Sequence, residues 1–336
     1  MNGRAYLDWN ATAPLRPEAR AAVLAGLDLV GNPSSVHAEG RAAKMAVERA
    51  REDLAAVVGC KAAEVIFTSG ATEAAGVLAG FAAVTVDPTA HDCLQAHAKG
   101  EGGVLALGLA NSETGVIADV PQRAGLLLDV VQAVGRMPFA FGWSGADFAI
   151  LSAHKLGGPK GVGALIVREG VDIAALQVGG GQEKGRRSGT ENLAGIMGFA
   201  AAAKAAERDL EVGLWERVRD LRDRFEARLL AAAPDSMIAG AGRPRLPNTS
   251  CIVTPGWKGE TQVMQMDLAG FAVSAGSACS SGKVRASRVL TAMGFDAQAA
   301  GSAIRVSLGV TTTEEEVMRL ADVWCAHHAR FRARAA

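Results

Sequence analysis

The sequence carries no net charge and contains no apolar run long enough to cross a membrane. Its 336 residues include 35 basic and 35 acidic side chains, which cancel. A chain without net charge has no overall electrostatic attraction for nucleic acid or for an anionic membrane surface, so a small molecule is the expected partner. The apolar stretches are broken by charge, Gly or Pro before the ~18 residues that a membrane helix requires. Residues 1–16 also lack the basic start and apolar core of a signal peptide, so we expect a cytoplasmic protein with no nucleic acid and no membrane among its partners.

Cysteine is scarce, and its spacing excludes two kinds of site. The five cysteines are odd in number and scattered along the chain: Cys60, Cys93, Cys251, Cys279 and Cys325. They show neither the pairing of a disulfide framework nor the spacing of a zinc site, so we expect no metal. This distribution leaves room for a reactive thiol at one of them.

Glycine, in contrast, is abundant and gathers in loops that follow short apolar runs. The chain has 40 glycines, a pattern typical of α/β enzymes whose backbone approaches a ligand closely. The runs that read as strands are residues 64–68, 104–109, 125–130, 148–151 and 163–167. They alternate with helical or loop patterns such as residues 41–58, which favours a mostly parallel sheet with ligands beyond the carboxyl ends of its strands.

A change of composition after Asn192 indicates a second domain. Residues 193–230 have helical periodicity with mixed charges, and we expect one long helical element there that carries the chain between domains. Strands are expected near residues 249–253 and 305–308. A last helix is expected to begin at a Thr-Thr-Glu-Glu-Glu sequence, whose hydroxyls and carboxylates suit a helix N-terminus. The expected architecture is a large α/β domain with a smaller α+β domain.

Lys155 stands where the apolar run 148–151 ends in a small, glycine-rich turn. Desolvation at such a position removes the proton from a lysine and makes its amine a nucleophile. A nucleophilic amine is what an aldehyde cofactor such as pyridoxal phosphate needs for a Schiff base. Asp129 ends a neighbouring run, where a buried carboxylate is costly to leave unpaired. A protonated pyridinium nitrogen would pair with it, although a helix cap or a salt bridge is the alternative.

Four further segments carry polar groups suited to a ligand. The hydroxyl-rich turn 68–74 opens a helix and could cradle a phosphate, and the loop 179–192 joins three glycines to donors for an anion. Residues 274–282 present Cys279 among small residues only, as a sulfur-transferring thiol requires. Arg305 is a charge inside an apolar run, for which a carboxylate partner is the usual resolution.

Three motifs, taken in order, resemble those of a known family. They are Ser-Ala-His-Lys at 152–155, Arg-Ser-Gly-Thr-Glu-Asn at 187–192 and Gly-Ser-Ala-Cys at 276–279. Together with residues 6–14, 31–37 and 302–309 they resemble cysteine desulfurases of the nitrogenase and iron–sulfur type, which are class V aminotransferases among the fold-type I pyridoxal phosphate enzymes. The resemblance implies a large α/β/α domain with a mostly parallel sheet over residues 12–209. A small α+β domain would comprise residues 1–11 and 210–336.

The resemblance also implies individual roles. Lys155 would form the Schiff base, Cys279 would accept the sulfur, and His91 would stack on the cofactor ring and handle protons. The cofactor, pyridoxal 5′-phosphate, would be held by residues around its ring and phosphate: Ala71, Thr72, His91, Ser112, Asp129, Gln132, Ser152, His154, Lys155 and Thr190. Asn10 and Arg305 would bind the substrate, Arg305 through the carboxylate. Thr190 matches a residue that reaches the phosphate of the neighbouring subunit, which implies a homodimer with shared sites.

The implied function is the conversion of L-cysteine to L-alanine, with a persulfide on Cys279 that passes to a sulfur-acceptor protein such as an iron–sulfur scaffold. A selenocysteine lyase or another cysteine C–S lyase of the same fold is one alternative, and a non-catalytic sulfur-binding or regulatory paralogue is another. The segment from His91 to Asp129 is shorter than in the family, so we expect at least one sheet-flanking element to be lost. Ser112 stands where the family usually has an asparagine, and His97 is the alternative to His91.

Overall fold

The computed structural model describes residues 3–275 and 286–335, which form two compact units. The large unit comprises Thr12–Ala110 and Ala118–Val212. The small unit comprises Met1–Ala11, Asn111–Ile117 and Gly213–Ala336. The expected domain division, with boundaries at 11/12 and 209/210, did not include the short segment Asn111–Ile117, which interrupts the large unit.

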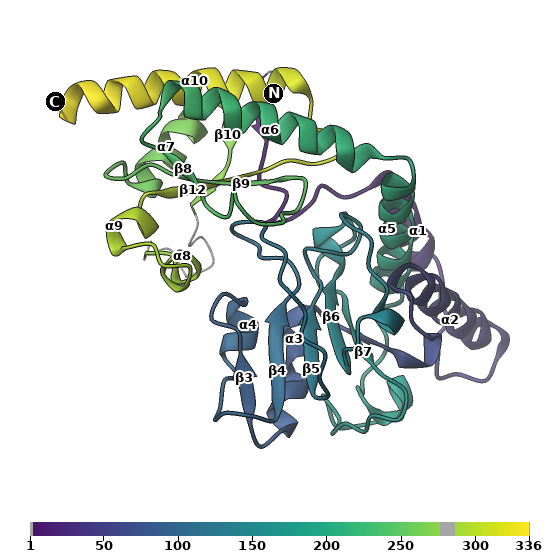
Figure 1. The fold of residues 1–336 in the computed structure, drawn as a ribbon. Coiled ribbons are helices and arrows are strands. Elements are labelled where there is room, and N and C mark those ends of the chain that lie inside the picture. The colour runs from purple at the N-terminus through teal and green to yellow at the C-terminus, as the bar shows by residue number, and fades with distance from the viewer. Residues whose placement is uncertain (1–2, 276–285, 336) are drawn as a thin grey trace. The chain divides into compact units, whose positions relative to one another are not determined.

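A six-stranded sheet forms the centre of the large unit, in the order β2-β7-β6-β5-β4-β3 (Figure 1). The strands β3, β4, β5 and β6 are parallel to one another, whereas β7 is antiparallel to both β2 and β6. The expected mostly parallel sheet is therefore confirmed. The strands are β2 (Val65–Thr68), β3 (Val84–Val86), β4 (Val104–Gly108), β5 (Leu126–Asp129), β6 (Phe148–Ser152) and β7 (Gly163–Val167). All five expected strands are present, and β3 is a short edge strand that the sequence did not predict.

Helices cover the large unit's sheet and add a bundle beside it. They are α1 (Pro17–Leu27), α2 (Ala38–Val58), α3 (Ala71–Ala75), α4 (Asp92–Gln95) and α5 (Leu193–Glu211), with short 3₁₀ turns at Ala62–Glu64, Gly76–Gly80, Phe141–Trp143, Ala153–Lys155 and Gln182–Gly185. The helix α5 packs against α1 and α2 (Figure 1). On one face of the sheet, Leu127, Phe148, Ile150 and Leu165 form a core with apolar residues of the α3–α4 region. Burial of these large side chains is the main source of stability for the unit.

The connection from β4 to β5 contains no crossover helix. Residues 109–125 contain no helix, although a parallel strand pair is usually joined by one. Instead, Asn111–Ile117 belongs to the small unit, where Val116 forms a β-bridge with Arg245 and the Leu246 amide donates to the Gly115 carbonyl at 2.7 Å. The expected loss of a sheet-flanking element relative to the family falls in this region and stays a prediction.

The small unit is built on two short sheets. β8 (Met237–Ile238), β9 (Thr249–Val253), β11 (Ser274–Ala275) and β12 (Ala303–Ser307) form an antiparallel sheet in the order β11-β12-β9-β8, and β1 (Ala5–Tyr6) pairs in parallel with β10 (Phe271–Ala272). Its helices are α6 (Leu214–Ala232), α7 (Gly259–Leu268), α8 (Arg288–Ala292), α9 (Ala297–Ala300) and α10 (Glu314–Ala335). The long helices α6 and α10 pack together (Figure 1). The expected α+β character of this part is confirmed.

The expectation of one long helix over residues 193–230 was wrong. The chain breaks between α5 and α6 at Gly213, whose φ of 73° lies in the left-handed region that glycine adopts without steric cost. The break coincides with the boundary between the two units. At the last helix, by contrast, the expected N-terminus forms: the Glu316 amide donates to Thr313 Oγ1, and the Thr313 amide donates to the Glu316 carboxylate.

No helix within residues 3–275 and 286–335 is both long and apolar enough to cross a membrane.

Candidate active site

The carboxyl ends of β5 and β6 bring Asp129 and Lys155 to one edge of the large unit's sheet. Asp129 is the last residue of β5, and Lys155 ends the 3₁₀ turn that follows β6, the parallel neighbour of β5. Gly157, with φ at 86°, then turns the chain away. Burial raises the pKa of Asp129, while the Val131 amide and the charges of His91 and Lys155 act in the opposite direction. A cationic ring nitrogen placed beside this carboxylate would offset its desolvation.

Of the two candidate histidines, His91 is the one whose charge acts on Asp129. The exposed His91 precedes α4, and its Nδ1 accepts a hydrogen bond from the Cys93 amide at 3.2 Å. An Nδ1 that accepts places the proton of the neutral ring on Nε2. These contacts favour His91 over His97 as the histidine of the site.

Arg136 fixes the orientation of Gln132. Its Nη1 donates to Gln132 Oε1, and its Nη2 donates to the Lys155 carbonyl at 3.0 Å. Both side chains are buried. A guanidinium has only donors, so it selects the amide oxygen and turns the Gln132 amino group away from itself. Sequence reasoning missed Arg136, although an arginine among small and apolar residues four positions after Gln132 was the available signal.

The turn between β2 and α3 provides open space for a phosphate. A Cβ built on Gly70 would meet no atom within 4 Å, whereas one on Gly163 of the adjacent strand β7 would lie 2.7 Å from the Gly70 Cα. The chain therefore approaches closely on one side of the turn and leaves the other side open. Ala71 and Thr72 begin the short helix α3 at this place, and Thr72 is exposed.

His154 lies in positively charged surroundings. Burial lowers its pKa from 6.5 to about 4, and the charges of Lys155 and Lys160 add to this effect. Its Nδ1 lies 3.1 Å from Thr12 Oγ1, and Ser152 precedes it as the buried last residue of β6. An anion such as a phosphate would be attracted by the charges of Lys155 and Lys160 and would favour the protonated form of His154. The residues present therefore fit a phosphate-bearing cofactor with an aldehyde and a basic ring nitrogen.

The pKa of His154 implies that the cofactor-free protein loses stability in mild acid. The unfolded chain takes up a proton near pH 6.5, whereas the folded chain does so only near pH 4. The free energy of unfolding is therefore highest above pH 6.5 with respect to this group, and it falls as the pH is lowered towards 4. Urea unfolding at pH 7 and pH 5 should show a smaller difference in His154→Gln than in the wild type. An equal difference in both proteins would refute the assignment.

In the small unit, Arg305 is buried on β12 and held by two oxygen atoms. Its Nη2 donates to Asp8 Oδ1 at 2.7 Å, and its Nη1 donates to the Ser112 carbonyl at 3.1 Å. The carboxylate partner expected for Arg305 is therefore Asp8. Within the described part of the chain, the buried Nε of Arg305 has no hydrogen-bond partner. A buried donor without a partner is costly, and a bound carboxylate would satisfy it.

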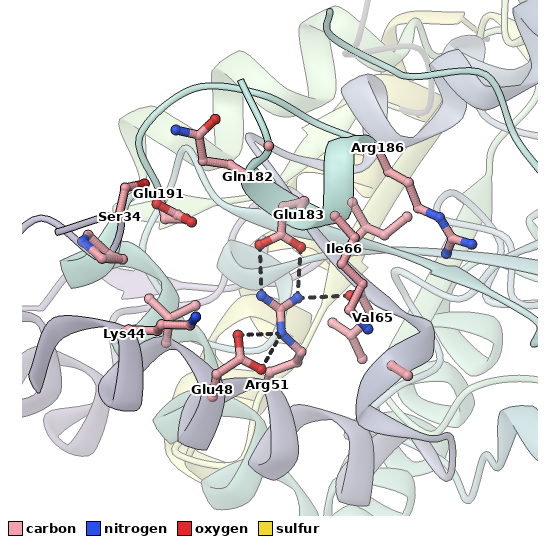
Figure 2. A pocket seen from close by; sticks show the side chains of 15 residues that line it. Ser34, Lys44, Glu48, Arg51, Val65, Ile66, Gln182, Glu183, Arg186 and Glu191 are labelled. Atoms are coloured by element: carbon pink, nitrogen blue, oxygen red, sulfur yellow. Dashed lines mark hydrogen bonds and ion pairs between the residues drawn. The ribbon is translucent and has the colours of Figure 1, made fainter. Parts of the chain in front are cut away.

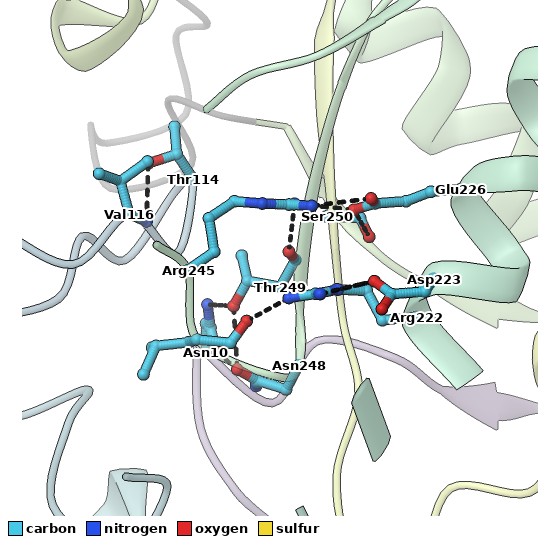
Figure 3. Close-up of polar contacts among 11 residues, drawn as sticks. Asn10, Thr114, Val116, Arg222, Asp223, Glu226, Arg245, Asn248, Thr249 and Ser250 are labelled. Atoms are coloured by element: carbon cyan, nitrogen blue, oxygen red, sulfur yellow. Dashed lines mark hydrogen bonds and ion pairs between the residues drawn. The ribbon is translucent and has the colours of Figure 1, made fainter. Parts of the chain in front are cut away.

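Asn10 supports the same carbonyl as Arg305. Its Nδ2 donates to the Ser112 carbonyl at 3.0 Å and to Thr249 Oγ1 at 2.9 Å, and its Oδ1 accepts from Asn248 Nδ2 at 3.1 Å. Figure 3 shows Asn10 beside Thr249 and Asn248. Asn10 is only 1% exposed, so its carboxamide is engaged by the protein. The structure brings Asn10, Ser112 and Arg305 together, with Asn10 in a supporting position.

The remaining expected site residues are Thr190 and Cys279. Thr190 is exposed at the end of the loop that precedes α5, and Cys279 lies outside the described residues. Among the described cysteines, burial raises the pKa of Cys60 and of Cys251 to about 12, and burial also raises the pKa of Cys325. These three thiols are protonated at neutral pH and are therefore poor nucleophiles.

Sequence comparisons place the chain among known proteins. The sequence model of the aminotransferase class-V family matches residues 5–93 and 84–320. A cysteine desulfurase of Cereibacter sphaeroides is 39% identical, with 95% of this chain and 94% of that protein covered. An IscS-like cysteine desulfurase of Mycobacterium tuberculosis is 35% identical, with 93% of each chain covered. The first alignment extends over 370 positions, so this chain of 336 residues lacks residues that its relative has.

Solved structures give the same result. A NifS-like protein superposes with a TM-score of 0.87 at 29% identity, covering 97% of this chain and all of the other. A NifS-like protein of Rickettsia africae superposes equally well at 28% identity, covering 96% and 98% of the two chains. The expected fold-type I α/β architecture is therefore confirmed. With a matching family model and relatives over nearly its whole length, the chain belongs to the class-V aminotransferase family.

Proposed function

We propose that this protein is a cysteine desulfurase that uses pyridoxal 5′-phosphate and converts L-cysteine to L-alanine. The observation that carries the proposal is the gathering of Lys155, Asp129 and His91 at the carboxyl ends of the parallel strands. The similarity to cysteine desulfurases over about 95% of the chain supports the same reaction. Nothing in the described residues favours the lyase or the non-catalytic alternative.

The large unit would hold the cofactor and move protons. Lys155 would bind the aldehyde covalently, Asp129 the ring nitrogen, and the Gln132 amino group the ring oxygen. Ala71, Thr72, Ser152 and His154 would hold the phosphate. When bound, pyridoxal phosphate supplies an electron sink for the charge that forms when the α-proton of cysteine is removed. The Lys155 amine, released by the incoming substrate, would take that proton, and His91 would exchange protons from Nε2.

The small unit would bind the substrate and receive its sulfur. Arg305 would bind the cysteine carboxylate through its unpartnered Nε, while Asp8 and the Ser112 carbonyl hold the guanidinium in place. Cys279 as a thiolate would attack the substrate sulfur. The bond from Cβ to sulfur breaks as the sulfur–sulfur bond of a persulfide forms, and the carbon skeleton takes up protons and leaves as alanine.

The proposal also includes a quaternary structure, a sulfur acceptor and a cellular location. They are a homodimer in which Thr190 reaches the phosphate in the partner subunit, a sulfur-acceptor protein such as an iron–sulfur scaffold, and a cytoplasmic location. The homodimer and the acceptor rest on the resemblance of the Arg-Ser-Gly-Thr and Gly-Ser-Ala-Cys motifs to those of the family, and the location rests on the short, interrupted apolar runs of the sequence.

The proposal is tested by incubating the purified protein with cysteine and recording its intact mass with and without reductant. We expect alanine and a reducible gain of one sulfur, which Cys279→Ser abolishes. Cys93→Ser, at a described cysteine without an assigned role, serves as the control and should retain both products. Alanine formation that is unaffected in Cys279→Ser would instead indicate a C–S lyase that needs no persulfide. Absence of both cofactor absorbance and alanine would indicate the non-catalytic paralogue.

A further inference from the structure

The loop that carries Thr190 contains an unfavourable backbone conformation. Glu183 and Lys184 have φ values of 48° and 57°, and they are the only non-glycine residues with positive φ in the described part of the chain. Two successive side chains in the left-handed region cost conformational free energy. Such a conformation persists only where the surroundings hold it. We refer to residues 179–190 as the glycine loop.

A buried ion pair holds the glycine loop at Glu183. Arg51 of α2 donates from Nη1 to Glu183 Oε2 at 2.7 Å and from Nη2 to Oε1 at 2.8 Å, so the pair is bidentate. The side chains are only 9% and 3% exposed. The same Glu183 carboxylate accepts the Phe67 amide at 3.1 Å, and Arg51 Nη1 also donates to the Val65 carbonyl at 2.8 Å. Figure 2 shows Arg51 pointing from its helix to Glu183 and Val65. The glycine loop is therefore tied to strand β2.

A second ion pair holds the glycine loop close to Thr190. Arg187 donates from Nε to Glu73 Oε1 at 2.8 Å and from Nη2 to Oε2 at 3.4 Å. Glu73 lies in α3 and accepts the Ser69 amide at 2.7 Å. The two carboxylates thus bind backbone amides at positions 67 and 69, on either side of Thr68. The Arg187–Glu73 pair joins the glycine loop to the turn that would hold the cofactor phosphate in the same chain, and the Arg51–Glu183 pair joins it to strand β2, which leads into that turn.

The glycine loop is held mainly by these polar contacts, because no close-packed apolar core covers it on the side of Arg51 and Glu183. Arg51, Glu183 and the neighbouring Gln182 border a cavity of about 600 Å³, so the glycine loop is not covered by a close-packed core on that side. Ser188 is buried and donates to the Gly180 carbonyl at 2.6 Å, which closes the glycine loop on itself. Thr190 remains exposed. The polar contacts therefore determine where Thr190 stands.

We propose that the Arg51–Glu183 and Arg187–Glu73 pairs are positioning pairs that fix Thr190 for the cofactor site of the partner subunit. This inference rests on the proposed function, in which Thr190 of one chain reaches the phosphate bound by the other. The two pairs attach the glycine loop to the phosphate turn of their own chain and to the strand before it. This part of one subunit would therefore position a phosphate ligand of the next. Loss of a pair therefore weakens the cofactor site that the displaced Thr190 would have served.

Mixed dimers with differently tagged subunits test this assignment, using Glu183→Gln. Glutamine retains an acceptor for the Phe67 amide but loses the charge paired with Arg51. In the first arrangement, one subunit carries Lys155→Ala and the other Glu183→Gln, so the single Lys155 faces an intact glycine loop. In the second, one subunit carries both substitutions, so the single Lys155 belongs to a wild-type chain that faces the altered loop. Borohydride reduction and intact mass then report cofactor bound covalently to the Lys155-bearing subunit over a titration.

We expect cofactor affinity to fall about tenfold or more in the second arrangement. In the first arrangement it should stay close to the affinity of a mixed dimer that carries Lys155→Ala but no substitution at Glu183. Glu18→Gln, which breaks the exposed Glu18–Arg208 pair, is the matched control and should change neither arrangement. A loss confined to the first arrangement would show that the pair serves its own chain, and equal affinity in both would also overturn the proposal.

Two further measurements distinguish a loss of folding from a displaced Thr190 as the cause of weaker cofactor binding. The double variant Arg51→Met with Glu183→Met removes both charges and so avoids leaving one buried charge alone. If Glu183→Gln lowers the melting temperature, this double variant takes its place in the mixed dimers. We expect it to give the same difference in cofactor affinity between the two arrangements. A monomeric wild type that still makes alanine would overturn this inference and leave the proposed function standing. A wild type that binds no pyridoxal phosphate would instead overturn the proposed function.

Discussion

Replacement of Lys155 by alanine is expected to abolish covalent attachment of pyridoxal phosphate and to reduce alanine formation by about 1,000-fold or more. In the proposed mechanism, the substitution removes both the amine that would bind the aldehyde and the base that would take the α-proton. Asp129 and Gln132 remain in place, so the cofactor can still bind without a covalent bond. Borohydride reduction followed by intact mass distinguishes the two states.

Lys160→Ala is the matched control for this experiment. Lys160 is exposed five residues further along, and its charge, like that of Lys155, lowers the pKa of His154. The control therefore changes the charge near the expected phosphate without removing the expected amine. We expect it to retain the covalent cofactor. If Lys155→Ala still carries a borohydride-stable adduct, the covalent role belongs to another lysine.

The sequence predicted those parts of the fold and site that depend on local pattern. The five strong apolar runs became β2, β4, β5, β6 and β7, because a run bounded by Gly or Pro needs only burial to form a strand. The edge strand β3 has only three residues, of which Val84 is the buried one. Its parallel pairing with β4 stabilises it, and no short segment encodes such a partner. The helix break at Gly213 is likewise a tertiary result, since helical periodicity continues on both sides.

Contacts between distant segments account for what the sequence did not predict in the site. Lys155 and Asp129 were proposed as site residues because Asp129 ends one apolar run and Lys155 follows the end of another. The carboxyl ends of neighbouring parallel strands meet at one edge. Arg136 contacts Lys155 from 19 positions away, and Arg51 contacts Glu183 from 132 positions away. Asn10 stays a predicted substrate-binding residue, and in the structure its carboxamide contacts Thr249 and Asn248. Residue type alone does not distinguish a ligand-binding amide from a supporting one.

The second large effect is expected at Arg305, a buried cation of the small unit. Arg305→Lys should reduce kcat/KM for cysteine by about 100-fold, mainly through a higher KM, because charge-assisted hydrogen bonds to a carboxylate contribute about 1.5–3 kcal/mol each. A lysine has a single nitrogen. One ammonium group cannot replace the three guanidinium nitrogens of Arg305, which contact Asp8 and the Ser112 carbonyl and leave Nε as a donor for the substrate.

Cysteamine, which is cysteine without its carboxylate, separates substrate binding from structural support. The wild type should bind cysteamine much more weakly than cysteine, and Arg305→Lys should bind both about equally weakly, as judged by the change in the absorbance of the bound cofactor. A second variant, Asp8→Asn with Arg305→Gln, removes both charges and avoids an unpaired buried carboxylate. If this charge-free variant is folded and still prefers cysteine to cysteamine, the substrate carboxylate binds elsewhere. If it loses that preference while retaining cofactor absorbance, the carboxylate subsite is Arg305, and the unpartnered Nε is the donor that the substrate satisfies.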